Sequence, residues 1–192
     1  MIKRFFVITI LLVLGLVVLY FSVKSNGDSV KDQVLKPSPY EPITSIQEEK
    51  NKHSGYILNT NKGDIKIVLD STVAPETVKN FDSKVNSGFY EGLTFHRVED
   101  WVIQGGDPLG NGTGGGNMPT ELSQKPFKEG SIGVARGGNI EISNDSQFFI
   151  CTTDCSFLTG QYTNFGDVVG GMDVAKLISI GDKINGIQTL KY

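Results

Sequence analysis

The stretch TFHRVEDWVIQGGDP, residues Thr94–Pro108, predicts two extended segments joined by a turn. Alternate side chains of an extended segment share a face, which places Phe95 with Arg97 and Val102 with Gln104. A cation and an amide are then expected among apolar side chains. A guanidinium in such surroundings has to be paired, stacked or functional, because burying an unpaired charge costs free energy.

The later run SQFFI, residues Ser146–Ile150, repeats this arrangement, with one amide, Gln147, beside two phenylalanines. A glutamine amide both donates and accepts hydrogen bonds. We therefore expect the two stretches to form a shallow apolar pocket rimmed by Arg97, Gln104 and Gln147.

The N-terminus carries a membrane-targeting pattern. Lys3 and Arg4 precede Phe5–Val23, 19 residues without a charge, and a helix of that length nearly matches the ~30 Å hydrocarbon core of a bilayer. Residues 1–24 are therefore predicted to be a single-pass anchor in the cell membrane, with the N-terminus cytoplasmic and the rest of the chain extracytoplasmic. A cleaved signal peptide, which would leave a secreted protein, remains the alternative.

The remainder divides into a linker and one domain. Residues 25–52 are polar and charged, contain three prolines and lack an apolar period, which indicates a flexible extracytoplasmic tether. Residues 53–192 are expected to form one folded domain. Beyond residue 24 the chain has 15 Lys plus Arg against 21 Asp plus Glu, and this acidic balance argues against nucleic acid as a partner.

The two cysteines of the chain, Cys151 and Cys155, leave two readings open. In an oxidising compartment they form a disulfide if their Cα atoms lie within about 7 Å. Otherwise they are two free thiols, one of them ending a buried strand. Their spacing is not that of a CxxC redox motif, and the chain groups too few ligands for a metal site.

The hydrophobic pattern of the domain indicates short strands and two helices. Strands are expected at 56–60, 65–69, 131–136, 147–152, 163–169 and 184–190, and amphipathic helices at 75–87 and 172–180. The second helix should turn Leu177 inward, and 137–145 should be a polar loop. Short sequential strands with a helix near each end predict a mostly β fold, a closed antiparallel barrel plugged or flanked by two α-helices.

The glycine-rich run GNGTGGG, Gly110–Gly116, contains the spacing GxGxxG. A dinucleotide-binding loop needs a strand running into it and a helix starting from it. Here Pro108 precedes the run and Pro119 follows it, so we expect no nucleotide site. The chain also lacks the GxSxG turn of many serine hydrolases.

Six segments follow one another in order over about residues 55–190: FHRV, QGGDP, GNGTGG, GSIGVAR, SQFFI and FLTGQYTNFGDVVGGMDV. Together they resemble the cyclophilin family of peptidyl-prolyl cis/trans isomerases. The resemblance implies a closed eight-stranded antiparallel β-barrel capped by two α-helices, with a proline-binding groove on its outside. It also implies an isomerase without a cofactor, whose partners are proline-containing unfolded or exported polypeptides.

The resemblance assigns roles to individual residues. The catalytic residue is Arg97. The substrate-binding residues are Trp101, Val102, Gln104, Gly112, Ala135, Arg136, Gln147, Phe149, Phe157, Leu158 and Tyr162. Phe157 stands where many eukaryotic members carry tryptophan, so cyclosporin binding is expected to be weak.

The residues suit that chemistry. Rotation about an X-Pro bond is slow because the amide nitrogen lone pair is delocalised, and a cation aimed at this nitrogen stabilises the twisted form selectively. The predicted function is therefore a prolyl isomerase that assists the folding of exported proteins. A catalytically weak proline-binding module is the rival hypothesis. Taken alone, Arg97 fits a surface ion pair with Glu99 or Asp100, and His96 fits a buried, hydrogen-bonded histidine.

Overall fold

The structure, a computed structural model, describes residues 53–190. The predicted membrane anchor, residues 1–24, and the predicted tether, residues 25–52, lie outside the described residues. Between residues 53 and 190, no helix combines the length and the apolar character that a membrane crossing requires.

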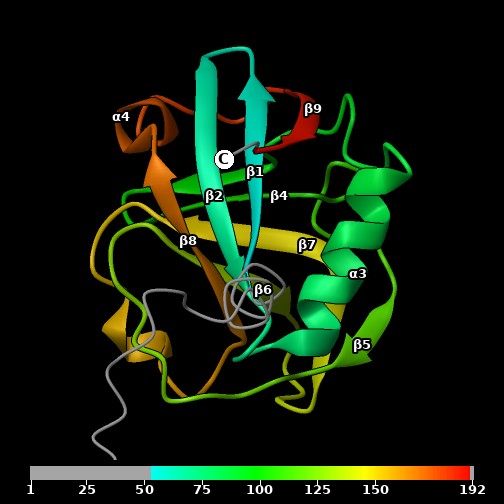
Figure 1. Cartoon of the computed structure of the whole chain (residues 1–192), viewed down its shortest axis with the longest axis vertical. Helices are drawn as coiled ribbons and strands as arrows, with labels where there is room; N and C mark the ends of the chain where they lie inside the picture. Colours follow the sequence, from blue (N-terminus) through cyan, green and yellow to red (C-terminus); the bar gives the residue numbers. More distant parts are fainter. Residues whose placement is uncertain (1–52, 191–192) are drawn as a thin grey trace, which may run out of the picture. The chain divides into compact units, whose positions relative to one another are not determined.

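Within residues 53–190, nine strands form one antiparallel sheet that curls around an apolar interior (Figure 1). The strands are β1 (His53–Thr60), β2 (Gly63–Asp70), β3 (Arg97–Glu99), β4 (Val102–Gly105), β5 (Asn117–Pro119), β6 (Ser131–Arg136), β7 (Ile142–Cys151), β8 (Asn164–Gly170) and β9 (Ile184–Thr189). Their order is β3-β4-β7-β6-β8-β2-β1-β9, and β5 pairs with the first residues of β7. The mostly β prediction is confirmed.

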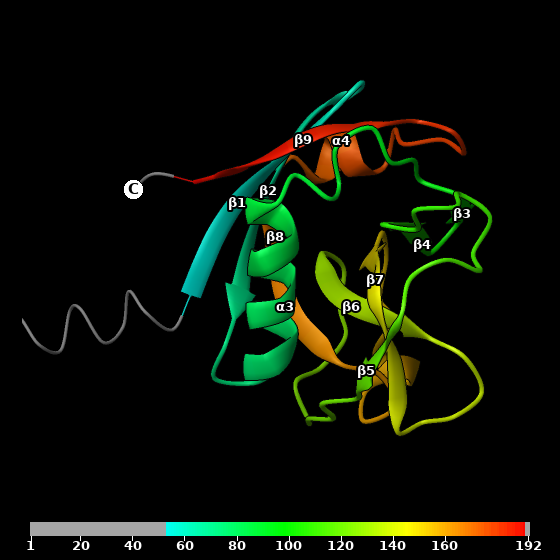
Figure 2. The same cartoon turned by 90° about the vertical axis from the view of Figure 1, so that its right-hand side faces the viewer.

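The sheet is open, so the predicted closed eight-stranded barrel is not confirmed: eight strands lie on the path from β3 to β9, and β5 lies off this path. Figure 2 shows β1, β2 and β9 on one side of the domain and β3, β4 and β7 on the other. Between the terminal strands β3 and β9 there is one isolated bridge, Thr94 to Lys183. Backbone hydrogen bonds from Phe95 to Asp182 (2.9 Å) and from Ile184 to Leu93 (2.8 Å) hold this seam. The residues before β3 are irregular, so no continuous ladder can form there.

The first hairpin is tighter than the sequence indicated. Thr60 pairs with Gly63, which leaves Asn61 and Lys62 as a two-residue turn. The Thr60 hydroxyl donates to the Gly63 carbonyl at 2.7 Å and accepts from the Lys62 backbone N–H at 3.1 Å. Gly63 has φ 131°, a value that side-chain-bearing residues rarely adopt.

Helix α3 (Pro75–Asn86) confirms the first predicted helix and covers part of the sheet interior beside β2 and β7 (Figure 1). Proline is tolerated at the first helical position, where its missing N–H would have no intrahelical partner. The residue before it, Ala74, has no side chain that can cap the helix. A distant carboxylate serves instead: Glu121 accepts the backbone N–H groups of Glu76 (3.1 Å) and Thr77 (2.8 Å).

Helix α4 (Met172–Ala175) is a single turn, so the prediction of a helix over 172–180 is wrong in length. The Lys176 N–H still donates to the Met172 carbonyl four residues earlier (3.0 Å). The N–H groups of Leu177 (3.0 Å) and Ile178 (3.3 Å) donate to carbonyls three residues earlier, which marks turns rather than a continuing α-helix. Leu177 is 63% exposed, so its predicted inward position is also wrong, whereas Ile178 is buried.

Strand β7 separates two apolar clusters because successive side chains of a strand point to opposite faces. Phe148 and Ile150 lie in the interior cluster, and Phe149 and Cys151 lie in a second cluster on the outer face. This strand starts at Ile142, so the polar loop predicted over 137–145 ends earlier than expected.

Candidate active site

A pocket of about 330 Å³ opens on the outer face of the sheet, over the second apolar cluster. We call it the outer pocket. It is lined by Arg97, Trp101, Gln104, Ala135, Arg136, Phe149, Phe157, Leu158 and Tyr162. All nine are residues that the sequence assigned to the site, from segments up to 65 positions apart.

Arg97 is held at the edge of the outer pocket by three partners. Its Nε donates to a carboxylate oxygen of Glu99 at 2.9 Å, and its Nη1 donates to Oε1 of Gln104 at 3.1 Å. Its guanidinium carbon lies 5.2 Å from the centre of the Trp101 ring. The predicted ion pair with Glu99 therefore exists alongside the pocket contacts, and the side chain is 37% exposed.

Phe95 does not share this environment. It is fully buried in the interior cluster, so the prediction that it lies beside Arg97 among the groove residues is wrong. Phe95 precedes β3, which begins at Arg97. The two residues are not in one regular strand, and the alternation rule does not relate their side chains.

The floor of the pocket is a stack of rings. Phe149 stacks on Phe127 with ring centres 5.7 Å apart, and Tyr162 meets Phe149 edge-on at 5.8 Å. Trp101 and Phe157 form a second edge-on pair at 5.2 Å. Aromatic pairs favour these offset and edge geometries.

One residue predicted for the pocket floor lies elsewhere, and one residue that shapes the floor was not predicted. Val102 is fully buried beneath the floor and does not line the pocket. Gly133 in β6 was not singled out, yet a Cβ there would collide with the Phe149 ring. Only a glycine thus lets this ring lie across the sheet.

The C-terminal part of β6 offers backbone groups to a ligand. The ladder with β7 shifts register between Val134 and Arg136, and Ala135 has no cross-strand partner in the register of either neighbouring strand. A bulged position of this kind leaves N–H and C=O groups available for pairing.

The Arg136 side chain donates to the carbonyls of Gln161 (2.9 Å) and Gly137 (2.8 Å) and lies 4.3 Å from the Tyr162 ring, rather than pairing with a carboxylate.

A second cavity of about 420 Å³, the side pocket, adjoins the outer pocket and shares Gln104, Ala135 and Arg136 with it. The remaining lining residues are Gly112, Asn117, Gly137, Gly138, Asn139, Ile142, Ser143, Asn144 and Gln147. Gly112 and Gln147, assigned to the site from the sequence, therefore belong to this side. The other seven were missed because they lie in or beside the segment 137–145, which was predicted to be a polar loop, or follow the glycine-rich run.

The two glutamines connect the pockets. Gln104 donates through Nε2 to Oε1 of Gln147 at 2.9 Å. Gln147 is buried and donates through its own Nε2 to the carbonyls of Gly112 (3.1 Å) and Gly114 (2.8 Å). Every one of these amide contacts has a donor facing an acceptor, which a buried network requires.

Beneath the glycine-rich loop lie two titratable groups. Both ring nitrogens of His96 are buried without a hydrogen-bond partner, so the expected hydrogen-bonded histidine is not found. Burial lowers the pKa of His96, against the opposing effects of Asp107 and of the nearby Gln147 amide. Burial acts to raise the pKa of Asp107, but the backbone N–H groups of Leu109, Asn111 and Gly112 outweigh it, and the pKa is lowered.

Cys151 and Cys155 are both free and fully buried in the outer-face cluster. The Cys155 thiol lies 3.6 Å from the carbonyl of Trp101. Burial raises the pKa of both thiols. Among residues 53–190, no group of three or more His, Cys, Asp or Glu side chains is placed to hold a metal ion.

Comparison with known proteins matches the described domain to one family. The family model described as cyclophilin type peptidyl-prolyl cis-trans isomerase/CLD matches residues 56–190. A peptidyl-prolyl cis-trans isomerase of Helicobacter pylori (strain ATCC 700392 / 26695) is 39% identical over 157 residues, which cover 77% of this chain and 95% of the relative. Peptidyl-prolyl cis-trans isomerase B of Bacillus subtilis (strain 168) is 39% identical over 140 residues, covering 70% and 96%.

The fold is also found among solved structures. A crystal structure of a cyclophilin type peptidyl-prolyl cis-trans isomerase from Cryptosporidium parvum has a TM-score of 0.68 at 28% identity, covering 73% of this chain and 99% of that one. A second crystal structure of that protein, in the presence of the dipeptide Ala-Pro, has a TM-score of 0.67 at 28% identity and covers 72% and 99%.

Proposed function

Since the chain belongs to the cyclophilin-type peptidyl-prolyl cis-trans isomerases, enzymes that need no cofactor, we propose that it binds proline-containing polypeptides in the outer pocket and isomerises them there. Arg97 is the catalytic residue in this proposal. The observation that carries it is the placement of a permanently charged group at the rim of an apolar, ring-lined pocket, held by Gln104 and Trp101.

The pocket suits a proline ring. The floor of Phe149 and Leu158 and the walls of Trp101 and Tyr162 offer apolar surface, and a volume of about 330 Å³ leaves room for one small ring. The unpaired backbone of Ala135 is placed to hold the chain that precedes the proline. One side of the X-Pro bond would be fixed while the other turns.

Arg97 would act on the twisted amide. In the planar ground state the proline nitrogen has little electron density to offer, whereas at the transition state its lone pair is localised. A donor that interacts with this lone pair stabilises the transition state more than the ground state, which is the requirement for catalysis. The Nε and Nη1 groups of Arg97 are engaged by protein partners, and its Nη2 has no hydrogen bond within the described residues.

The biological setting is an extension of this proposal. The uncharged run at residues 5–23 supports a membrane anchor with the isomerase domain on the extracytoplasmic side, and secretion after cleavage remains the alternative. Uncatalysed prolyl isomerisation takes tens to hundreds of seconds and limits folding. The clients would be exported polypeptides, and the two bacterial relatives at 39% identity favour a bacterial setting. Weak cyclosporin binding stays a prediction from Phe157.

The test is a protease-coupled isomerisation assay on a proline-containing peptide, comparing the parent chain with Arg97→Ala. We expect kcat/KM to fall on the order of 100-fold, the effect of removing one preorganised electrostatic group. Lys79→Ala is the control, because Lys79 lies on α3 with an 80% exposed side chain. A variant without Arg97 that turns over as fast as the control would refute the assigned role.

A further inference from the structure

The catalytic role proposed for Arg97 depends on the orientation of two amides. Gln104 presents Oε1 to Arg97 and Nε2 to Gln147. If the Gln104 amide were reversed, its NH₂ would face the guanidinium, donor against donor. The position of Arg97 therefore depends on which way Gln147 points.

Gln147 is oriented by the glycine-rich loop. Its Nε2 donates to the carbonyls of Gly112 and Gly114, which leaves Oε1 for Gln104. Reversing this amide would set its oxygen against two carbonyl oxygens in a buried site, an arrangement that costs the full desolvation of unpaired groups. The two carbonyls thus set the polarity of the whole chain of hydrogen bonds that ends at Arg97.

The peptide that carries the Gly112 carbonyl has one local contact, because its N–H, on Thr113, donates to the Asn111 side chain at 3.0 Å. Gly110 has φ 67° and Gly112 has φ 89°, both in the left-handed region, and glycine moves between backbone states at low cost. A buried restraint on the same residues comes from Asp107, which is 1% exposed. Its Oδ1 accepts the N–H of Leu109 at 2.9 Å, and its Oδ2 accepts the N–H groups of Asn111 and Gly112.

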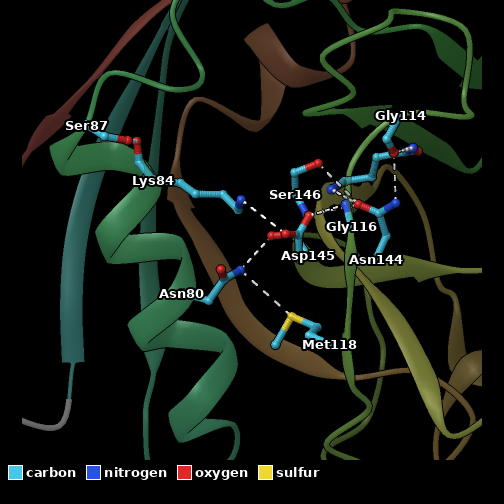
Figure 3. Close-up of polar contacts among 10 residues, drawn as sticks. Asn80, Lys84, Ser87, Gly114, Gly116, Met118, Asn144, Asp145 and Ser146 are labelled. Carbon is cyan, nitrogen blue, oxygen red and sulfur yellow. Dashed lines mark hydrogen bonds and ion pairs between the residues drawn. The ribbon is translucent and has the colours of Figure 1, made fainter.

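The Gly114 carbonyl has a second anchor, Asn144, as Figure 3 shows. The Asn144 Oδ1 accepts the backbone N–H groups of Ser146 (2.9 Å) and Gln147 (2.8 Å), so its Nδ2 must face the loop, where it donates to Gly114 at 2.9 Å. The neighbouring Asp145 accepts from the backbone of Gly116 at 2.7 Å.

This second anchor is tied to the helix. Asp145 also pairs with Lys84 of α3 at 3.4 Å, and Asn80 donates to the Asp145 carbonyl (Figure 3). The Gly114 end of the loop is thereby braced on α3 and β7. The Gly112 end has the Asp107 carboxylate as its anchor.

We propose that Asp107 is a positioning residue for Arg97, acting through the Gly112 carbonyl and the amides of Gln147 and Gln104, with Asn144 as the second anchor of the same loop. The proposal rests on the proposed function of Arg97. Asp107 lines neither pocket, so it does not touch a ligand bound there, and the hydrogen bonds described above connect it to Arg97.

The substitution Asp107→Asn tests the positioning role, because asparagine has almost the same shape as aspartate. An amide cannot accept on both of its ends, so one end of the side chain would face a backbone N–H with a donor. We expect kcat/KM of the full chain to fall about tenfold, which corresponds to ~1.4 kcal/mol of transition-state stabilisation. In spectra of labelled protein, the side-chain amide signals of Gln104 and Gln147 should shift.

Asp182→Asn is the matched control. Asp182 is also buried and also organises a turn, accepting from the Ser179 backbone at 2.7 Å and from the Asn61 amide at 2.7 Å, and it lies in neither pocket. It should leave kcat/KM within about twofold of the parent, because its contacts do not reach the two glutamines. Equal losses in the two variants would mean a general structural effect and would overturn the proposal.

A double-mutant cycle separates this proposal from the one it rests on. If Asp107 acts through Arg97, then adding Asp107→Asn to Arg97→Ala should change kcat/KM less than twofold. Additive losses, or unshifted glutamine signals, would overturn the positioning role while leaving Arg97 catalytic. An unimpaired Arg97→Ala single variant would instead refute the proposed function. Should Asp107→Asn fail to fold, Asn144→Asp, which removes the donor to Gly114, tests the second anchor of the same loop. Because Asn144 also lines the side pocket, a loss of kcat/KM supports the proposal only together with shifted Gln104 and Gln147 amide signals, and unshifted signals overturn it.

Discussion

The Arg97 guanidinium is partly exposed, yet three weak contacts fix its position and orientation. An exposed ion pair such as that with Glu99 contributes only about 0 to 1 kcal/mol, and a cation over an exposed ring about 0.5 to 1 kcal/mol. Contributions of this size add little to the free energy of unfolding. Together with the bond to Gln104 they restrict the guanidinium to one place, which a lysine with a single ammonium group could not reproduce.

The cysteines lead to a prediction at the same scale. Burial raises the pKa of the Cys151 and Cys155 thiols, and the thiolate is the form that reacts. We expect alkylation by iodoacetamide at pH 8 to be at least about tenfold slower in the native chain than in the urea-unfolded chain, since each pKa unit removes about nine tenths of the thiolate. Timed mass spectrometry measures this, and equal rates in both states would contradict the buried, protonated thiols.

The sequence singled out side chains whose residue type is rare in its surroundings. An arginine and two glutamines among rings stood out, and the structure brings Arg97, Gln104 and Gln147 into one connected network. Gly133 and Phe127 did not stand out. Their importance comes from the position of the Phe149 ring, which depends on contacts between strands distant in sequence.

At the level of elements, α3 depends on a capping group from another part of the chain. Ala74 offers no side-chain acceptor at the N-terminus, and Glu121 accepts from Glu76 and Thr77 instead, 44 or more residues away. A carboxylate at this end also interacts favourably with the helix dipole. Folding of the helix is thereby coupled to the path of the loop that contains Glu121.

Removing that carboxylate should loosen the helix. We expect Glu121→Ala to lower the free energy of unfolding by about 1 to 2 kcal/mol, the usual cost of losing an N-terminal cap. Urea denaturation followed by circular dichroism measures the change. Glu141→Ala, at an exposed position, is the control and should stay within about 0.5 kcal/mol of the parent. Similar values for the two variants would show that Glu121 is not a cap.

Element boundaries were predictable where the pattern was long. The β1–β2 hairpin and α3 lie where periodicity placed them, because 12 helical residues or two 8-residue strands give a clear signal. The boundaries of the short elements were not predictable. Strand β5 has three residues in a glycine-rich region, and α4 stops after one turn although apolar residues continue at helical spacing. Tertiary contacts set their ends, which a local pattern does not contain.

At the level of the whole molecule, the open seam explains why closure could not be predicted. Strand count and ladder continuity are decided by the pairing of residues some 90 positions apart, such as Thr94 with Lys183. A sequence pattern indicates strands but not whether the terminal ones meet. The seam is held by backbone bonds, and the Asp182 carboxylate supports one side of it by joining the first hairpin to the turn before β9.

The lowered pKa of Asp182 makes the free energy of unfolding fall as the pH is lowered into the acid range. Hydrogen bonding by the Asn61 amide lowers the pKa of Asp182, outweighing the effect of burial, and the Ser179 backbone and Lys62 act in the same sense. A carboxyl whose folded pKa is depressed stabilises the fold above its unfolded pKa of about 3.8 and loses that contribution as pH falls through the folded value. The junction between the first hairpin and the turn before β9 should therefore weaken in acid.

Asp182→Asn isolates this contribution, because the asparagine has no charge to lose. We expect the parent to exceed the variant in free energy of unfolding at pH 7, and the difference to shrink as the pH is lowered below about 4, where the parent's carboxyl takes up its proton. Urea denaturation at a series of pH values measures it. Asp173→Asn, on the short helix α4, is the control for removing one charge. A difference that stays constant down to pH 2.5, or grows, would show that the ionised Asp182 does not stabilise this junction.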